Sequence, residues 1–260
     1  MLIKTKNSLK ASKTQKKQKT SKKGLCGFVA LWQENNYINA KNTVKIALFI
    51  MFLLFVDTFS QTKPEFQIAR LKYSGGGDWY NDPSAEINLL KFINKETTIK
   101  VNPEYVFVEV ASDDIFNYPF LFITGHGNIV FSKSEVDRIR KYLERGGFIY
   151  VDDDYGMNKA IRREFKKVFL NQEFVELPFS HKIYHSLYDF KSGPPKTHEH
   201  DNKPPQGFGL FIDKRLAVYY TFESNPSDGW TDKDVHNNPE NKRLEALQFG
   251  ANIIIYALTN

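Results

Sequence analysis

Acidic and histidine side chains follow two short apolar runs of this sequence, where they could perform acid–base or metal chemistry. His126 stands in the glycine turn TGHG after the run FLFI, and Asp152, Asp153 and Asp154 follow the run FIYV. Three adjacent carboxylates crowd negative charge, so at least one needs a cation, a histidinium, a backbone-amide cap or a raised pKa. A divalent metal would meet that need with His126 as a further ligand, or His126 could act as a general base. The candidate catalytic residues are His126, Asp153 and Asp154.

A second group of candidates combines carboxylates with aromatic rings. The loop GGGDWY brings Asp78 beside Trp79 and Tyr80, and the later stretch SDGW places Trp230 near another acid. These rings offer stacking surfaces suited to a sugar ring. The alternative is a glycine turn in which Trp79 covers the sheet edge. The predicted ligand-binding residues are Asp78, Trp79, Tyr80, His126, Asp152 and Trp230.

Two further histidines, in the stretch HKIYH, raise the question of a metal site. On a helix, His181 and His185 would share one face and could bind a metal. Pro178 and the β-prone residues between the histidines argue against a helix and favour hydrogen-bonded structural histidines. The candidate metal ligands are these two residues together with His126 and Asp153.

The elements between the first two polar loops predict how those loops are placed. The apolar runs are too short for helices and indicate buried strands. Between them, SKSE predicts a capping box that begins a helix, and Gly146–Gly147 predicts its end. Such a unit has parallel strands, and ligands bind beyond their carboxyl ends. His126 and the three aspartates are therefore expected to face one crevice, unless the aspartates only cap the next helix and bond neighbouring loops.

The remaining sequence predicts an alternation of strands and helices. Strands are expected at 66–73, 99–101, 105–110 and 174–177, helices at 82–95 and 160–168, a hairpin at 210–221, and a closing helix at 239–258. The helix at 82–95 would begin with Asp82 as its N-cap and proline at its first position. Residues 191–208 are rich in proline, glycine and histidine and predict a long surface loop, a candidate lid.

Charge is distributed unevenly along the 260 residues, whose net charge is +6. Residues 1–60 hold 11 Lys and Arg against 2 Asp and Glu, which leaves 25 basic and 28 acidic residues in 61–260, a net charge of −3. That balance gives no reason to expect nucleic-acid binding by the folded part. The single cysteine, Cys26, precedes it, so residues 61–260 hold no disulfide, thiol nucleophile or cysteine metal site.

The N-terminal part is expected to be a leader rather than a folded domain. Residues 1–43 form a basic extension expected to be disordered, and 44–60 contain an 11-residue apolar run followed by small residues, the layout of a signal peptide. Translation that starts near Val44 would explain the long extension. Alternatively, the uncleaved segment is a short anchor in the inner membrane. Either arrangement predicts that residues 61–260 are exported, in a periplasmic or other extracytoplasmic location.

Several blocks of this sequence together resemble one bacterial family, domain of unknown function 4159; they are GGGDWY, FITGHG, GGFIYVDDDYG, HKIYH, SDGW and the ending GANIIIYALT. The resemblance covers about residues 65–260. It implies an α/β three-layer sandwich with a mostly parallel central sheet, a flavodoxin-like branch of the class I glutamine-amidotransferase-like superfamily.

The same resemblance argues against glutamine amidotransferase activity. In true amidotransferases, the strand after the glycine-ended helix leads into a sharp turn with a nucleophilic cysteine, then any residue, then glycine. Here that register reads Asp154-Tyr155-Gly156, and residues 61–260 hold no cysteine. The carboxylate in that position cannot form a thioester.

Two functions remain open from the sequence. We favour an exported or membrane-anchored, non-catalytic module that binds a polar ligand or a partner protein of the cell envelope, because it explains the leader and the missing nucleophile. The alternative is a metal-assisted hydrolase that acts on a carbohydrate or similar polar substrate through the Asp and His residues. Only the alternative requires a cofactor, a divalent metal.

Overall fold

The computed structural model describes residues 41–45 and 65–260. The chain divides into two units, Met1–Pro64 and Glu65–Asn260. In the first unit, residues 41–45 are helical and exposed, and the rest of the predicted extension 1–43 and apolar segment 44–60 lies outside the described residues. Within the described ranges, no helix is long and apolar enough to cross a membrane. We call residues 65–260 the body.

The body is built on a seven-stranded sheet in the order β2-β1-β3-β4-β7-β6-β5. The first five strands in this order are parallel, whereas β6 pairs antiparallel with both β7 and β5. The strands are β1 (Ala69–Lys72), β2 (Val106–Glu109), β3 (Phe120–Ile123), β4 (Phe148–Asp152), β5 (Val175–Glu176), β6 (Gln206–Ile212) and β7 (Arg215–Phe222).

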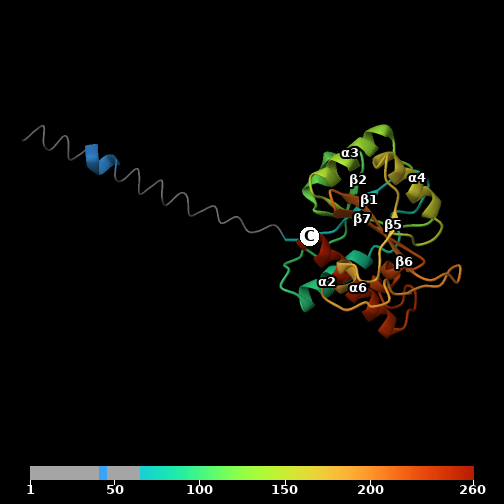
Figure 1. The fold of residues 1–260 in the computed structure, drawn as a ribbon. Coiled ribbons are helices and arrows are strands. Elements are labelled where there is room, and N and C mark those ends of the chain that lie inside the picture. The colour runs from blue at the N-terminus through green and yellow to red at the C-terminus, as the bar shows by residue number, and fades with distance from the viewer. Residues whose placement is uncertain (1–40, 46–64) are drawn as a thin grey trace, which may run out of the picture. The chain divides into compact units, whose positions relative to one another are not determined.

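Helices cover both faces of the sheet, as Figure 1 shows for α3 and α4 on one side and α2 and α6 on the other. They are α2 (Ala85–Glu96), α3 (Lys133–Glu144), α4 (Asn158–Val168), α5 (Pro226–Trp230) and α6 (Glu240–Thr259). Two 3₁₀ turns, Asp113–Asn117 and Lys182–His185, complete the described elements. The body is therefore an α/β fold with a mostly parallel sheet, as predicted.

The strand–helix–strand unit around α3 follows from local sequence. β3 and β4 are buried on both faces, which explains their unbroken apolar runs. Phe122 stacks on Tyr150 across them, with 5.5 Å between ring centroids. Ser132 and Glu135 form the predicted capping box, in which each side chain accepts the other residue's backbone N–H.

In the described residues 99–101 no strand forms, and Val101 makes only an isolated bridge with Phe66. Two further local predictions are wrong. Asp82 does not cap α2, because the cap position belongs to Ser84, and Asp82 lies before it with a left-handed φ of 46°. The stretch SDGW, for which we expected an accessible ring at Trp230, forms the buried helix α5 with Pro226 at its start. Both differences bring an aspartate to the carboxyl edge of the sheet.

The order of the strands opens a crevice at that edge. β1 is followed by α2 on one face, whereas its neighbour β3 is followed by α3 on the other. Loops that leave adjacent parallel strands in opposite directions make a topological switch point, where α/β folds bind ligands. The loops that carry Asp78, His126 and Asp154 all leave the sheet there.

Candidate functional site

Asp152 is an internal anchor. It is fully buried and accepts hydrogen bonds from the Thr221 hydroxyl (2.6 Å) and from the Ser227 backbone N–H (2.9 Å) and hydroxyl (2.7 Å). Burial raises its pKa to about 7, although these donors oppose the shift. Asp152 therefore fixes the start of α5. Because it is fully buried, a ligand in solvent cannot reach it.

Asp153 also has structural partners. Its carboxylate accepts from the Met157 backbone N–H (2.8 Å), just before α4, and from the Tyr220 hydroxyl (3.1 Å). Burial raises its pKa to about 6. The helix-capping alternative therefore describes Asp153, and both its carboxylate oxygens are engaged by the protein.

Asp154 differs from Asp152 because it lines, together with Asp153, a hollow at the carboxyl edge of the sheet. Asn81 and Asn225 donate side-chain N–H groups to its two oxygens, at 2.5 and 2.9 Å. Burial raises its pKa to about 8, and the nearby carboxylates of Asp228, Asp152 and Asp82 add to the shift.

His126 lies between two carboxylates. Its Nδ1 is 3.0 Å from Asp78 Oδ2 and 3.3 Å from Asp154 Oδ2, and its backbone N–H donates to Asp78 at 2.5 Å. Its turn pairs with Tyr155 through the hydrogen bond from Gly127 N–H to the Tyr155 carbonyl (2.9 Å). The structure thus places the His126 loop and the triple-aspartate loop together, whereas the roles given to these residues stay predictions.

The glycine before His126 leads to a testable expectation. Gly125 has φ of 138°, and a Cβ there would press on the Tyr73 hydroxyl and lie 3.0 Å from Asp78 Oδ1. At Gly127, with φ of 80°, an added Cβ would have no neighbour within 4 Å among the described residues. Each change to alanine should cost about 1–2 kcal/mol for the backbone, and Gly125→Ala about 1–3 kcal/mol more for overpacking.

Urea unfolding of both glycine variants measures this difference. An equal loss of unfolding free energy in Gly125→Ala and Gly127→Ala would contradict the close packing of the turn against Tyr73 and Asp78.

A second cluster includes Asp154, and its other members were not predicted as site residues. His198 Nδ1 is 2.7 Å from Asp228 Oδ2, and His236 Nε2 is 3.0 Å from Asp82 Oδ2 and 3.8 Å from Asp228 Oδ1. Asp228 is only 2% exposed, and its Oδ1 has no hydrogen-bond partner among the described residues. A buried carboxylate oxygen without a donor is costly, so this atom is a candidate ligand for a cation.

The donor atoms of the cluster fall into two sets with metal-like spacing. Within each set, one ligand atom per residue lies within 4.8 Å of the others. The sets are His198, Asp228 and His236, and Asp82, Asp154 and Asp228. We call these five residues the Asp/His cluster.

Hydrogen bonds and ring stacking hold the histidines in and beside the Asp/His cluster. The hydrogen bond with Asp82 raises the pKa of His236 to about 9, and the Asp228 carboxylate adds to that effect. His200 stacks on His198 and on Tyr155, with ring centroids 4.7 and 4.6 Å apart. Its Nε2 lies 2.8 Å from Asn225 Nδ2. Burial lowers the pKa of His200, which favours a neutral ring beside the cluster.

Three predicted site residues lie elsewhere. His185 bonds to Asp189 and the Phe179 carbonyl, and the His181 ring packs 5.4 Å from that of Tyr256. Neither histidine belongs to a metal-like set among the described residues; His185 lies in the 3₁₀ turn and His181 is the N-cap of that turn. Trp230 is buried, so its predicted role as a stacking surface is wrong.

The other aromatic candidates are accessible. The Tyr80 side chain is 63% exposed, and Trp79 packs between it and Phe107 on the edge strand, with ring centroids 5.5 and 5.3 Å away. Trp79 therefore covers the sheet edge, as the structural alternative expected. Tyr80 stays available for contact with a ligand.

The loop predicted as a lid, residues 191–208, contains His198 and His200, which were not predicted as site residues. Thr197 N–H donates to the Ser224 carbonyl (2.8 Å), and Lys196 forms an ion pair with Glu223 (2.9 Å), so the segment is tied to the end of β7. His198 and His200 follow directly. The pattern HEHD was the available sequence signal, whereas His236 stands in a loop without a recognisable motif.

A hollow of about 340 Å³ opens beside the cluster, and its lining includes Asp154, Tyr155, Lys159, His200 and Lys203. It provides room for a substrate next to the carboxylates.

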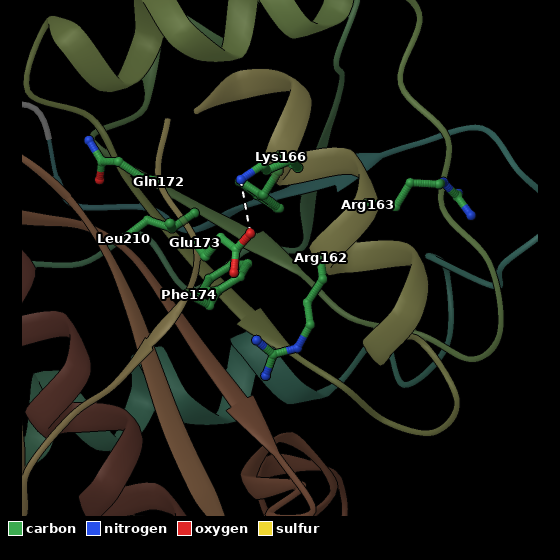
Figure 2. A pocket seen from close by; sticks show the side chains of 8 residues that line it. Arg162, Arg163, Lys166, Gln172, Glu173, Phe174 and Leu210 are labelled. Atoms are coloured by element: carbon green, nitrogen blue, oxygen red, sulfur yellow. Dashed lines mark hydrogen bonds and ion pairs between the residues drawn. The ribbon is translucent and has the colours of Figure 1, made fainter. Parts of the chain in front are cut away.

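A separate hollow of about 320 Å³ lies along α4 and is drawn in Figure 2. Its cations are already engaged: Lys166 pairs with Glu173 (2.9 Å), and Arg163 pairs with Glu164 (2.6 Å). It shares no residue with the cluster.

Comparison with protein families gives one match: a model described as domain of unknown function (DUF4159) covers residues 67–258. Comparison with curated proteins gives no match.

Proposed function

The chain belongs to the DUF4159 family of domains of unknown function, and on that premise we propose that its body is a divalent-metal-dependent hydrolase. The observation that carries the proposal is the unpartnered, buried Oδ1 of Asp228 beside His236. Imidazole nitrogens with carboxylate oxygens are the donor set of many zinc, manganese and iron sites. A cation bound there would satisfy Asp228 and relieve the repulsion among three carboxylates.

Access distinguishes a catalytic metal site from a structural one. Structural sites are closed, whereas catalytic sites keep a coordination position for water or substrate. The His198 side chain is 45% exposed and that of Asp228 2%, so the cluster has a buried floor and an open side. A divalent cation supplies a Lewis acid and lowers the pKa of water, which suits hydrolysis.

His126 would move the proton in this reaction. Asp78 holds its Nδ1, and within the described part of the chain its Nε2 has no hydrogen-bond partner, so that nitrogen is free to accept a proton from water. Its other neighbour, Asp154, belongs to the Asp/His cluster. The general base and the metal would thus act on the same side of the crevice.

We propose the finer fold and location on weaker support. The parallel strands follow the order 2-1-3-4-5 of a flavodoxin-like sheet, which supports the class I glutamine-amidotransferase-like superfamily. Asp154 in the nucleophile's register gives no amidotransferase chemistry. The apolar segment 44–60 supports export or anchoring in the inner membrane, and the exposed ring of Tyr80 supports a carbohydrate or similar polar substrate.

A non-catalytic envelope module is the second candidate. The observation that favours it is the aromatic edge made by Trp79, Tyr80 and Phe107, which can hold a ligand or partner without any chemistry. The two functions differ in whether a bound metal leads to turnover.

Metal addition tests the site itself. A cation at about 100 times its Kd should stabilise the fold by about 2.7 kcal/mol, or roughly 5–10 °C in melting temperature for a body of this size. The measurement is metal content by elemental analysis, with thermal melting in EDTA and in excess Zn²⁺ or Mn²⁺. His198→Ala should lose the shift and the control His185→Ala should keep it.

An equal response in both histidine variants, or none in the wild type, argues against the site. Turnover of chromogenic esters and glycosides then separates the two functions. Hydrolysis that needs the metal and is lost in His126→Asn supports the enzyme, whereas metal binding without turnover favours the module.

A further inference from the structure

The two donor sets of the Asp/His cluster share one residue, Asp228, and we infer that the site holds two divalent cations bridged by its carboxylate. One ion would be held by His198, His236 and Asp228, and the other by Asp82, Asp154 and Asp228. The inference rests on the proposed metal-dependent function and adds the number of ions and the ligands of each.

The two oxygens of Asp228 face different partners. Oδ2 lies 2.7 Å from His198 Nδ1, and Oδ1 lies 3.8 Å from His236 Nε2. The residue is 2% exposed and sits in α5, whose start is fixed by the bonds from Ser227 to Asp152. Both of these histidines belong to the first set, and a ligand atom of the same carboxylate lies within 4.8 Å of ligand atoms of Asp82 and Asp154 in the second. A rigid carboxylate shared by two sets can bridge two ions about 3.5–4 Å apart, the separation found in two-metal hydrolases.

Charge also favours two ions over one. Among the described residues, no lysine or arginine pairs with Asp82, Asp154 or Asp228, so histidines are the only cationic partners of these carboxylates. Metal binding has to displace the protons of His236 and Asp154, and one dication would then leave the three ionised carboxylates with an excess negative charge. Two dications make the net charge of the ions and their ligands positive, and a hydroxide or an anionic substrate oxygen can then balance that charge.

Within the second set, neutral amide donors orient Asp154, whereas the Asp82 carboxylate is paired with His236. Asn81 and Asn225 donate to Asp154 at 2.5 and 2.9 Å, and Arg70 contacts the carbonyl of Asp82 at 3.4 Å rather than its carboxylate. These contacts orient the ligands through hydrogen bonds, the usual arrangement around bound metals.

The test is a calorimetric titration of the metal-free full chain with Mn²⁺, followed by electron paramagnetic resonance of the loaded protein. We expect two equivalents and an exchange-coupled spectrum. Asp82→Asn and His198→Ala should each bind one equivalent at least about 10-fold more weakly and lose the coupling. His185→Ala, outside both sets, should bind two coupled ions.

Each other outcome overturns the inference. One equivalent in the wild type leaves the proposed function standing and removes the bridge, and so do two equivalents without coupling. No binding at all overturns the proposed function as well. The wild-type titration decides even if a variant fails to fold.

Discussion

Asp228→Asn is expected to abolish the stabilisation of the body by divalent cations while leaving the metal-free protein folded. The change preserves the size of the side chain and removes the charge that faces both donor sets. Because loss of a residue that only supports a ligand already lowers metal affinity about 10–100-fold, loss of this shared ligand should lower it more than about 100-fold. At a metal concentration that stabilises the wild type by about 2.7 kcal/mol, the variant should gain almost nothing.

The melting temperature of the metal-free protein distinguishes a loss of metal binding from misfolding. Asparagine keeps an oxygen toward His198 and relieves the repulsion between Asp228 and Asp154, so melting in EDTA should stay close to that of the wild type. Asp232→Asn is the matched control, because Asp232 is exposed and bonds to Asn88 (2.9 Å) outside the cluster. A metal-induced shift of wild-type size in Asp228→Asn would remove the central ligand from the proposal.

The elements of the fold that could be predicted are those determined by residues close together in the sequence. The capping box at Ser132, the glycine end of α3 and the buried strands on either side are set by residues close together in sequence. The same local signals placed His126 and Asp154 at one edge, because parallel strands with a single crossover leave their carboxyl ends together. This half of the candidate site could therefore be read from the sequence.

The other half depends on contacts between distant segments. Asp82 precedes a proline at the start of a helix, so local propensity made it a cap, whereas the structure turns its side chain toward His236, 154 residues later. His236 has no neighbours in sequence that mark it. Trp230 looked exposed because polar residues surround it, but its Nε1 donates to the Ala246 carbonyl (2.8 Å) inside the core. Only tertiary packing decides these positions.

Arg70→Met is expected to cause a large loss of stability together with a loss of metal affinity. Arg70 is fully buried, and its guanidinium binds Glu86 through two contacts of 2.6 Å. Burial raises the pKa of Glu86, and Arg70 opposes that shift. Removal of one partner from a buried ion pair leaves an uncompensated charge and costs about 3–5 kcal/mol.

The same guanidinium braces the loop that carries Asp82. It also donates to the backbone carbonyls of Trp79 (3.2 Å), Asn81 and Asp82 (3.4 Å). These groups lose their donor in Arg70→Met, so the loop that presents Asp82 to the cluster loses its support. Metal affinity should fall about 10–100-fold, as for other residues that orient a ligand.

A double variant separates the two effects. Arg70→Met with Glu86→Leu replaces the buried pair by apolar side chains, which is often neutral for stability, so most of the lost unfolding free energy should return. The loop carbonyls stay without a donor, so metal affinity should stay low. Urea unfolding and metal titration of the single and double variants measure both quantities.

The control is an exposed ion pair of the same type. Arg138 contacts Asp113 at 3.0 Å on the surface, so Arg138→Met should cost less than about 1 kcal/mol. If the double variant regains both stability and metal affinity, the loop does not depend on Arg70, and its link to the site is disproved. If it regains stability alone, the buried arginine orients Asp82 through the backbone of its loop.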